Sequence, residues 1–258
     1  MSIIYTPPIQ IKRLGIVSRD YRFIFNNGYR DFSFSFPSIL KLLDDKKCDA
    51  VLFSLYSIVP REGNNIYTSL VNLSNIKSVF LEEFIDSNPR QIKRFVVFHN
   101  TSVKWEEYEL HQKFSTLTGM YEEEILNFVA TEIPKRVFGN SVVLLCGETN
   151  GVKYSKGDKS IHDTYGLENA IPKKVNVVLN PVHDRMTRFE MNMKREFLSR
   201  NNRWVVSVWN KGKQDKNGKI KDGVKPAWTV YNNGEERSIE SILNSYNLEI
   251  GILDIDNS

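Results

Sequence analysis

Short, nearly continuous apolar runs rich in β-branched residues recur along the whole chain. Runs of this kind are typical of strands that are covered on both faces of a sheet. They occupy residues 13–18, 50–56, 94–99, 141–146, 175–180 and 204–210. The pattern therefore predicts a set of buried strands spread over most of the sequence.

Helical patterns lie between several of these runs. Residues 36–45 (FPSILKLLDD) precede the second run, and Met186, Phe189, Met193 and Phe197 share one helical face at i, i+3, i+7 and i+11 before the last run. Strands that alternate with amphipathic helices indicate layered α/β architecture.

The last part of the chain has a different pattern. Residues 211–225 hold six lysines and an Asn217-Gly218 turn signal, which predicts an exposed loop or hairpin. Residues 227–231 and 249–256 are expected to form antiparallel edge strands. No internal repeat or linker divides the sequence, so we expect one domain over residues 1–258.

Composition excludes disordered, collagen-like and low-complexity proteins. With 41% hydrophobic and 26% charged residues the chain should fold around a packed core. The net charge of +4 is small and the two signs are mixed, so no nucleic-acid partner is predicted. The first 20 residues do not resemble a signal peptide, and no apolar stretch is long enough to span a bilayer. We therefore expect a cytoplasmic protein with no membrane partner.

Metal and cofactor chemistry is not indicated. The two cysteines, Cys48 and Cys146, are too few for a disulfide scaffold or a thiolate zinc site, which favours a reducing compartment. The four histidines have no metal-ligand spacing, so neither a metal nor a cofactor is predicted. His183 is expected in an ordinary loop role, with a place in a pocket lining as the alternative.

Cys146 is the first candidate for chemistry. It ends the apolar run VVLLC and is followed by Gly147, so the thiol is expected at the carboxyl edge of a sheet, where α/β enzymes place reactive groups. The alternative is a small buried hydrophobic residue. Lys113, 33 residues earlier, could lower the pKa of such a thiol and stabilise an oxyanion, or could be a solvated surface lysine.

Several segments together resemble the carbon-nitrogen hydrolase, or nitrilase, superfamily. They are CDAVLFSL (48–55), YELHQKFSTL (108–117), VVLLCGETN (142–150), the long segment 177–212, WTVYNNGE (228–235) and IGILDID (250–256). Their order and spacing over nearly the whole chain carry the resemblance.

The resemblance implies a role for each matching residue. Cys146 corresponds to the nucleophile, Lys113 to the oxyanion-stabilising lysine, and one of residues 122–124, with Glu122 the first, to a second glutamate. Glu148 resembles the C-x-E arrangement of nitrilase-like branches. The remaining matches are the Asn180-Pro181 segment, Arg195 on the following helix, and Asn210 with Gly212 at a strand end. The N–H group of Gly147 would complete the oxyanion site.

One departure from the family pattern concerns the general base. The family places a glutamate in a Pro-Glu dipeptide at the end of the second strand, but Ser54 and Leu55 occupy that place. Leucine cannot transfer a proton, so either another carboxylate serves, Glu62 or Glu148, or the reaction is lost.

The resemblance implies a four-layer αββα sandwich and association into a homodimer or higher homo-oligomer. The helix predicted over residues 187–200, which holds Met191 and Met193 among charged residues, would contribute to that interface. The implied function is hydrolysis of a nonpeptide C–N bond, in an amide or nitrile, through a thioester on Cys146. The alternative is a catalytically reduced protein of the same fold that binds a small ligand or a partner protein.

Overall fold

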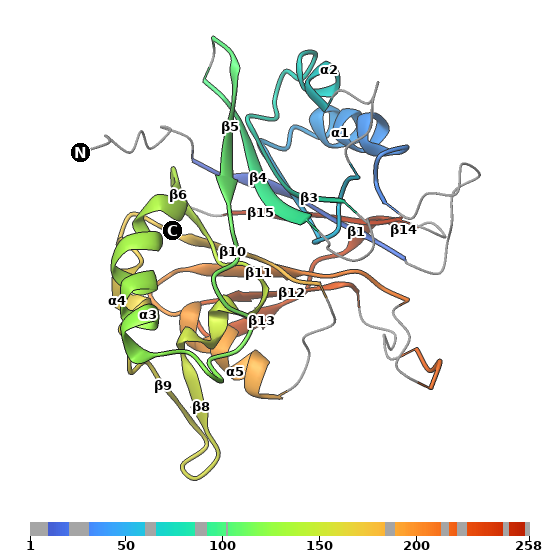
Figure 1. Cartoon of the computed structure of the whole chain (residues 1–258). Coiled ribbons are helices and arrows are strands. Elements are labelled where there is room, and N and C mark those ends of the chain that lie inside the picture. The colour runs from blue at the N-terminus through green and yellow to red at the C-terminus, as the bar shows by residue number, and fades with distance from the viewer. Residues whose placement is uncertain are drawn as a thin grey trace.

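A computed structural model describes residues 10–20, 31–59, 66–85, 92–101, 103–183, 189–212, 217–220, 226–244 and 248–255. Within this part of the chain, two large mixed sheets pack face to face, and helices cover the outer face of each (Figure 1). The fold is therefore a four-layer αββα sandwich.

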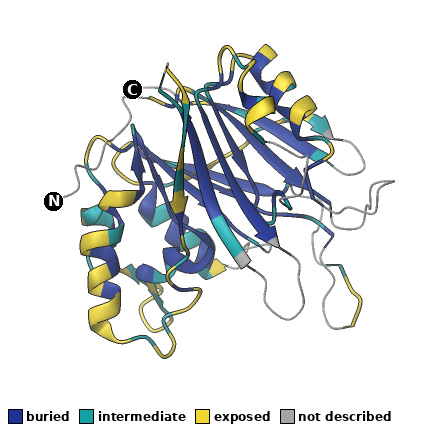
Figure 2. Cartoon of the chain, turned by 45° about the horizontal axis from the view of Figure 1, so that its top comes forward, coloured by how far each residue is buried: buried dark blue, intermediate teal, exposed yellow. Residues whose placement is uncertain are grey.

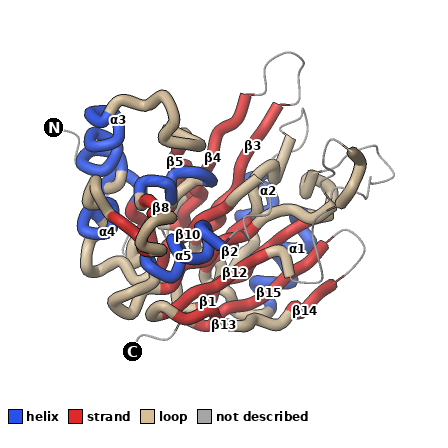
Figure 3. The backbone as a smooth tube through the Cα atoms, turned by 90° about the horizontal axis from the view of Figure 1, so that it is seen from below, coloured by secondary structure: helices blue, strands red, loops and turns tan. Residues whose placement is uncertain are grey.

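The first sheet has seven strands in the order β14-β15-β1-β2-β3-β4-β5. Its central strands β1, β2 and β3 are parallel, and the flanking strands are antiparallel to their neighbours. Figure 3 shows β1, β15 and β14 side by side toward one edge. The strands are β1 (Arg13–Arg19), β2 (Ala50–Phe53), β3 (Ser78–Ile85), β4 (Ile92–Asn100), β5 (Trp105–Leu110), β14 (Ser241–Asn244) and β15 (Leu248–Asp254).

The second sheet has six strands in the order β13-β12-β11-β10-β7-β6. Here β7, β10 and β11 are parallel, so their carboxyl ends meet at one edge. The strands are β6 (Val137–Phe138), β7 (Ser141–Val143), β10 (Val177–Pro181), β11 (Trp204–Val208), β12 (Trp228–Asn232) and β13 (Glu235–Arg237). A separate hairpin joins β8 (Lys153–Ser155) to β9 (Ser160–His162).

Helices form the two outer layers. The first sheet is covered by α1 (Phe36–Asp45) and α2 (Ile66–Leu70), and the second by α3 (Glu122–Asn127), α4 (Leu167–Ala170) and α5 (Phe189–Leu198). Short turns of other helix types follow α3 at Phe128–Glu132 and Pro134–Arg136 and lie after β7 at Cys146–Gly151. Figure 2 shows the helices exposed on their outer faces and the strands buried.

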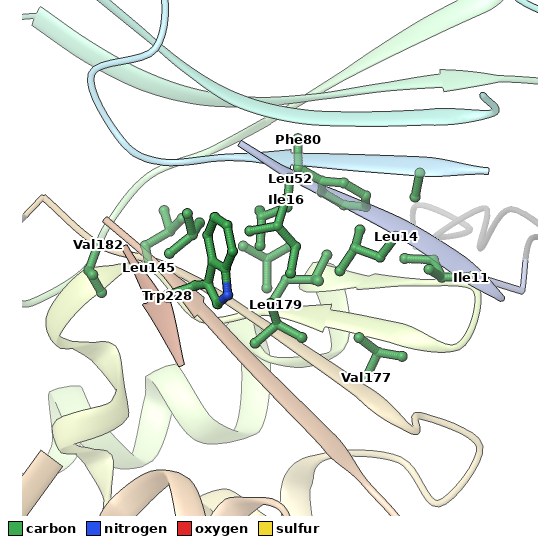
Figure 4. Packing of buried hydrophobic residues seen from close by; sticks show 14 of the residues in the cluster. Ile11, Leu14, Ile16, Leu52, Phe80, Leu145, Val177, Leu179, Val182 and Trp228 are labelled. Carbon is green, nitrogen blue, oxygen red and sulfur yellow. The ribbon is translucent and has the colours of Figure 1, made fainter. Parts of the chain in front are cut away.

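Three hydrophobic clusters hold the layers together. The largest lies between the sheets and combines residues such as Leu52 and Phe80 of the first sheet with Leu179 and Trp228 of the second (Figure 4). The other two lie between each sheet and its helices. Because β-branched and aromatic side chains fill both faces of the central strands, those strands have the continuous apolar sequences that predict them.

The predicted strands and helices are confirmed, with shifted ends. The helix over residues 36–45 has the predicted bounds, with proline in its first turn. The expected helix before the last run is α5. Its predicted buried face is wrong: Phe189 is 63% exposed, and the buried residues are Met191, Lys194, Arg195 and Leu198, because the two cations turn inward with the apolar residues. Met186 lies outside the described residues.

Strands β12 and β15 are antiparallel as predicted. Their prediction as edge strands is wrong, because the short strands β13 and β14 lie outside them. Most of the lysine-rich segment 211–225 lies outside the described residues.

No helix among the described residues is long and apolar enough to cross a membrane. Met191, proposed for an oligomer interface, is 3% exposed within its own chain, whereas Phe189 at the start of α5 is 63% exposed. Homo-oligomer formation stays a prediction.

Candidate active site

Cys146 lies at the carboxyl end of the second sheet, three residues after β7 ends. It begins the short helical turn Cys146–Gly151 with φ of +39°, in the left-handed region. Non-glycine residues in this conformation are strained and are concentrated at functional sites. The side chain is 8% exposed and belongs to the cluster between the sheets, so the thiol lies at the boundary of the core.

Asn180 at the end of β10 holds the cysteine turn in place. Its side-chain amide donates to the carbonyl oxygens of Leu144 at 2.7 Å and Cys146 at 3.3 Å. Its carbonyl oxygen accepts a hydrogen bond from Ser207 on β11. The Asn-Pro segment noted in the sequence therefore connects the neighbouring strand ends to the nucleophile loop.

Gly147 is required by close packing. A Cβ atom at this position would lie 2.0 Å from the carbonyl oxygen of Ser115, a backbone atom that cannot turn aside. The segment after β5 thus crosses directly over the cysteine turn, which only glycine permits.

Glu148 is fully buried and joins three segments. One oxygen accepts from the guanidinium of Arg136 at 2.6 Å and from the N–H of Leu145 at 2.7 Å, and the other accepts from the N–H of Lys113 at 2.8 Å. Burial raises the pKa of Glu148 to about 7, against the lowering effects of Arg136 and the two N–H groups. This carboxylate acts as the anchor of the cysteine turn.

The side chain of Lys113 points to the helical layer. Its ammonium group lies 3.2 Å from a carboxylate oxygen of Glu132, and the side chain is 42% exposed. The oxyanion role of Lys113 stays a prediction, and this geometry gives the ammonium group a different partner.

The glutamates proposed as the second family glutamate form the exposed first turn of α3. They are Glu122, Glu123 and Glu124. Glu124 accepts a hydrogen bond from the N–H of Tyr121 and so begins the helix. Solvated carboxylates on an outer layer are not placed to move protons at a buried thiol, and the structure does not bring Glu122 into the site.

Leu55 stands two residues after β2, at the position where the resemblance predicts the family's general-base glutamate. It is 1% exposed, and its carbonyl oxygen accepts a hydrogen bond from the side-chain amide of Asn210 at 2.7 Å. The carbonyl oxygen of that amide accepts from the hydroxyl of Ser54. Asn210 thus holds the Leu55 segment as Asn180 holds the cysteine turn. Gly212, two residues beyond Asn210, has φ of +79°. Glu62 lies outside the described residues.

His183 connects the two sheets beside Cys146. It follows β10, and its Nε2 lies 3.2 and 3.3 Å from the carboxylate oxygens of Glu82 on β3. The imidazole also interacts with the Cys146 side chain. Burial alone lowers the pKa of His183, but the hydrogen bonds with Cys146 and Glu82 and their negative charges outweigh it and raise the pKa to about 9. The imidazole is therefore a cation at neutral pH.

Tyr56 fixes both members of the His183–Glu82 pair. Its N–H donates to Glu82 at 2.6 Å, and its ring centroid lies 4.3 Å from that of His183. Tyr56 has φ of +56°, so it is a second strained non-glycine residue at the site. Lys93 on β4 donates to the Tyr56 hydroxyl at 2.7 Å.

A second buried cation interacts with Cys146. Arg195 on α5 is 1% exposed, and the negative charge of a Cys146 thiolate would stabilise its guanidinium. Burial lowers the pKa of Arg195 to about 10, so it still carries a positive charge at neutral pH. His183 and Arg195 are therefore two buried cations close to the cysteine turn.

A cavity of about 380 Å³ opens beside these residues. Its wall includes Leu145, which precedes the cysteine, together with Glu82 and Lys93. The other lining residues are Leu55, Phe95, Leu110, His111 and Gln112. Apolar residues and polar or charged residues thus contribute equally to the lining, four of each. Among the residues that the structure describes, no group of three His, Cys, Asp or Glu side chains could hold a metal ion.

Solved structures with a similar fold include members of the nitrilase superfamily. A carbon-nitrogen hydrolase from Helicobacter pylori G27 matches with a TM-score of 0.50 and 11% identity over 95% of this chain and 90% of that chain. A double mutant of the amidase from Nesterenkonia sp. AN1, in complex with acrylamide, matches with a TM-score of 0.50 and 10% identity over 96% of this chain and 93% of that chain. No protein-family model and no curated protein sequence matches. The chain therefore has the nitrilase fold, as the sequence motifs predicted.

Sequence reasoning did not find Glu82, and it favoured an ordinary loop role for His183. These residues are 101 positions apart and lie on different sheets. The available signal was the position of His183 directly after the Asn-Pro segment, since a residue there lies at the same sheet edge as Cys146.

Proposed function

We propose that this protein is a cysteine-dependent hydrolase of a nonpeptide C–N bond in an amide or nitrile. The observation that supports this most strongly is Cys146 itself. Its backbone is left-handed at the edge of the sheet, its turn is anchored by Asn180 and Glu148, and its side chain interacts with His183. A cysteine that served only as a small core residue would not require a left-handed backbone or a cationic partner.

The reaction would begin with attack of the thiolate on the carbon of the C–N group. Loss of ammonia or an amine would leave a thioester on Cys146, and water would then release the acid. The N–H group of Gly147 is the oxyanion donor in this proposal, because it directly follows the nucleophile in the tight turn. The amidase that shares the fold binds acrylamide, which supports an amide as the first substrate to try.

The test uses the second cysteine as an internal control. Cys48 is fully buried, and burial raises its pKa to about 12, so it should resist alkylation at neutral pH. Iodoacetamide followed by mass spectrometry should modify Cys146 and leave Cys48 intact. Ammonia release from a panel of small amides should then be lost in Cys146→Ala and kept in Cys48→Ala. Equal turnover by wild type and Cys146→Ala would refute the proposal.

The catalytically reduced alternative is favoured by a specific observation. Leu55 occupies the place of the family's glutamate, and with Leu110 and Leu145 it makes part of the cavity wall apolar. A protein that only binds a ligand would show saturable binding of that ligand with no ammonia release, and Cys146→Ala would bind it equally well.

A further inference from the structure

We propose that His183 is the proton-transfer residue of this site and that Glu82 positions it, so that Cys146, His183 and Glu82 form a nucleophile–base–carboxylate set. The proposal rests on the function proposed above and assigns the residue that replaces the glutamate missing at position 55. With this set, no side chain from the Ser54-Leu55 segment, where the family places its general base, is needed for proton transfer.

Two of the three groups follow strand ends, and the third comes from the interior of a strand in the other sheet. Cys146 follows β7 and His183 follows β10, which are adjacent parallel strands, and Glu82 reaches across from β3 of the other sheet. The imidazole Nε2 of His183 lies 3.2 Å from a carboxylate oxygen of Glu82. Asn180, three residues before His183, donates to the carbonyl oxygen of Cys146 at 3.3 Å, which places the His183 segment against the cysteine turn, and the Cys146 side chain interacts with the imidazole. A nucleophile in hydrogen-bond contact with a base that a third group orients is the arrangement that activates cysteine and serine enzymes.

Glu82 is held more firmly than a carboxylate that only forms a surface ion pair. Its side chain is 7% exposed, and one oxygen accepts the N–H of Tyr56. Its backbone N–H donates to the hydroxyl of Ser57 at 3.1 Å. The carboxylate therefore has little freedom to turn away from the imidazole, and the ring of Tyr56 also packs against His183.

The neighbouring glutamate shows that this arrangement is specific. Glu83 points to the opposite face of the same strand, where it forms an ion pair with Arg94 at 2.5 Å. Both glutamates are almost fully buried, at 5% and 6% exposure, but only Glu82 faces the cysteine side of the sheet. Glu83 is therefore a natural control for Glu82.

In this proposal Cys146 and His183 react as a thiolate–imidazolium pair, and charged groups of both signs surround them. Glu82 and the Cys146 thiolate supply negative charge from β3 and the cysteine turn. Lys93 supplies positive charge from β4 through its contact with Tyr56, and Arg195 interacts with Cys146 from α5. Two anions and three cations, counting His183, thus share the site, and the sulfur is the anion that can leave to attack a substrate.

The chemical steps balance with these groups alone. The thiolate electron pair forms the C–S bond while the carbonyl π pair moves to oxygen. Collapse of this intermediate breaks the C–N bond, and the His183 proton goes to the leaving nitrogen, which leaves a thioester and a neutral imidazole. Neutral His183 then takes a proton from water as the water oxygen attacks the thioester, and the C–S electron pair returns to sulfur.

The decisive measurement is the rate of Cys146 alkylation by iodoacetamide from pH 5.5 to 9, followed by mass spectrometry. An unpaired thiol loses about tenfold in rate for each pH unit below about 8, because only the thiolate reacts. We expect the wild-type rate to change less than threefold between pH 6 and pH 8. His183→Gln should restore the tenfold loss per unit, and Glu82→Gln should lie between the two.

Glu83→Gln and His99→Gln are the matched controls. His99 is also a buried histidine, 2% exposed, but it pairs with Ser78 on β3. Both controls should keep the wild-type profile. A wild-type alkylation rate that falls tenfold for each pH unit below about 8 would overturn the proposal by itself. The proposal can therefore be refuted even if a variant fails to fold. A His183→Gln profile identical to that of the wild type would also overturn it.

Failure of this inference is distinguishable from failure of the proposed hydrolase. If amides are turned over but the alkylation profile does not depend on His183, the hydrolase stands and the base is another group. If the profile depends on His183 but no amide or nitrile reacts, the activated thiol stands and the hydrolase proposal fails.

Discussion

Replacing Glu148 by alanine should destabilise the protein strongly, because this carboxylate compensates a buried charge. Arg136 is 1% exposed and depends on Glu148 for its ion pair at 2.6 Å. Removing one member of a buried pair leaves an uncompensated charge and costs about 3–5 kcal/mol. The N–H groups of Leu145 and Lys113 would lose their acceptor as well. We therefore expect a loss of at least about 3 kcal/mol in the free energy of unfolding, a large part of the stability of a typical domain.

The assay is urea unfolding at pH 8, above the pKa of about 7 to which burial raises Glu148, so that the wild-type carboxylate is charged. Glu148→Gln keeps the volume and one acceptor oxygen, and it should lose about half as much stability. Glu123→Ala, on the exposed first turn of α3, is the control and should stay within about 0.5 kcal/mol of wild type.

Two results would refute this reasoning. A loss below about 1 kcal/mol in Glu148→Ala would mean that Arg136 finds another partner or reaches water. Wild-type stability in Glu148→Gln combined with complete loss of amide turnover would instead show that Glu148 acts in catalysis, as the C-x-E resemblance implies, and not mainly as the anchor of the turn.

Three further predictions concern the turns and the histidine. Gly147→Ala should cost at least about 2 kcal/mol and slow Cys146 alkylation, because its Cβ would lie 2.0 Å from a backbone oxygen, whereas Gly157→Ala, with its nearest atom at 3.9 Å, should be neutral in urea unfolding. Asn210→Ala should cost about 2–3 kcal/mol by thermal or urea unfolding, since the Leu55 carbonyl and Ser54 hydroxyl lose their partner; unchanged stability would contradict its anchoring role. The pKa of His183 rises from 6.5 to about 9 on folding, so its stabilisation is complete below pH 6.5 and is lost as pH rises through 9. The stability difference between wild type and His183→Gln should therefore shrink by about 3 kcal/mol from pH 6 to pH 9.5, and a constant difference would contradict the assignment.

The strands that sequence analysis predicted are those with two apolar faces. The central strands β1, β2, β10 and β11 contact the cluster between the sheets on one face and helices on the other, so their apolar character is continuous. Strand β5 (WEEYEL) was not predicted, because most of its residues are exposed or half-buried at the edge of the sheet. In β3 the pair Glu82 and Glu83 interrupts the apolar run, and each carboxylate is buried only because its partner comes from elsewhere. The hydrophobic pattern of a single strand does not show that a distant residue will pair with a buried carboxylate.

The candidate site was predictable to a similar extent. The position of Cys146 follows from the end of an apolar run, and the anchoring asparagines follow from the Asn-Pro segment and the end of the next strand. The direction of the Lys113 side chain could not be predicted, because its partner Glu132 is set by the packing of the helical layer. The contact between His183 and Glu82 depends on the two sheets facing each other, which composition and spacing do not encode locally.

Leu55 provides the sharpest test of whether the missing glutamate has been replaced or only lost. Asn210 holds the backbone of this segment through the Leu55 carbonyl, so the loop keeps its place whatever side chain stands there. The leucine side chain, however, is 1% exposed within the cluster between the sheets. A carboxylate introduced by Leu55→Glu would be buried near Glu82, whose negative charge would repel it, and Lys93 in the same cavity wall already contacts Tyr56. We expect Leu55→Glu to lower the free energy of unfolding by about 3 kcal/mol or more and to leave amide turnover no higher than in wild type. A stable Leu55→Glu variant with increased turnover would show that the site still requires the family's glutamate, and that His183 does not do its work.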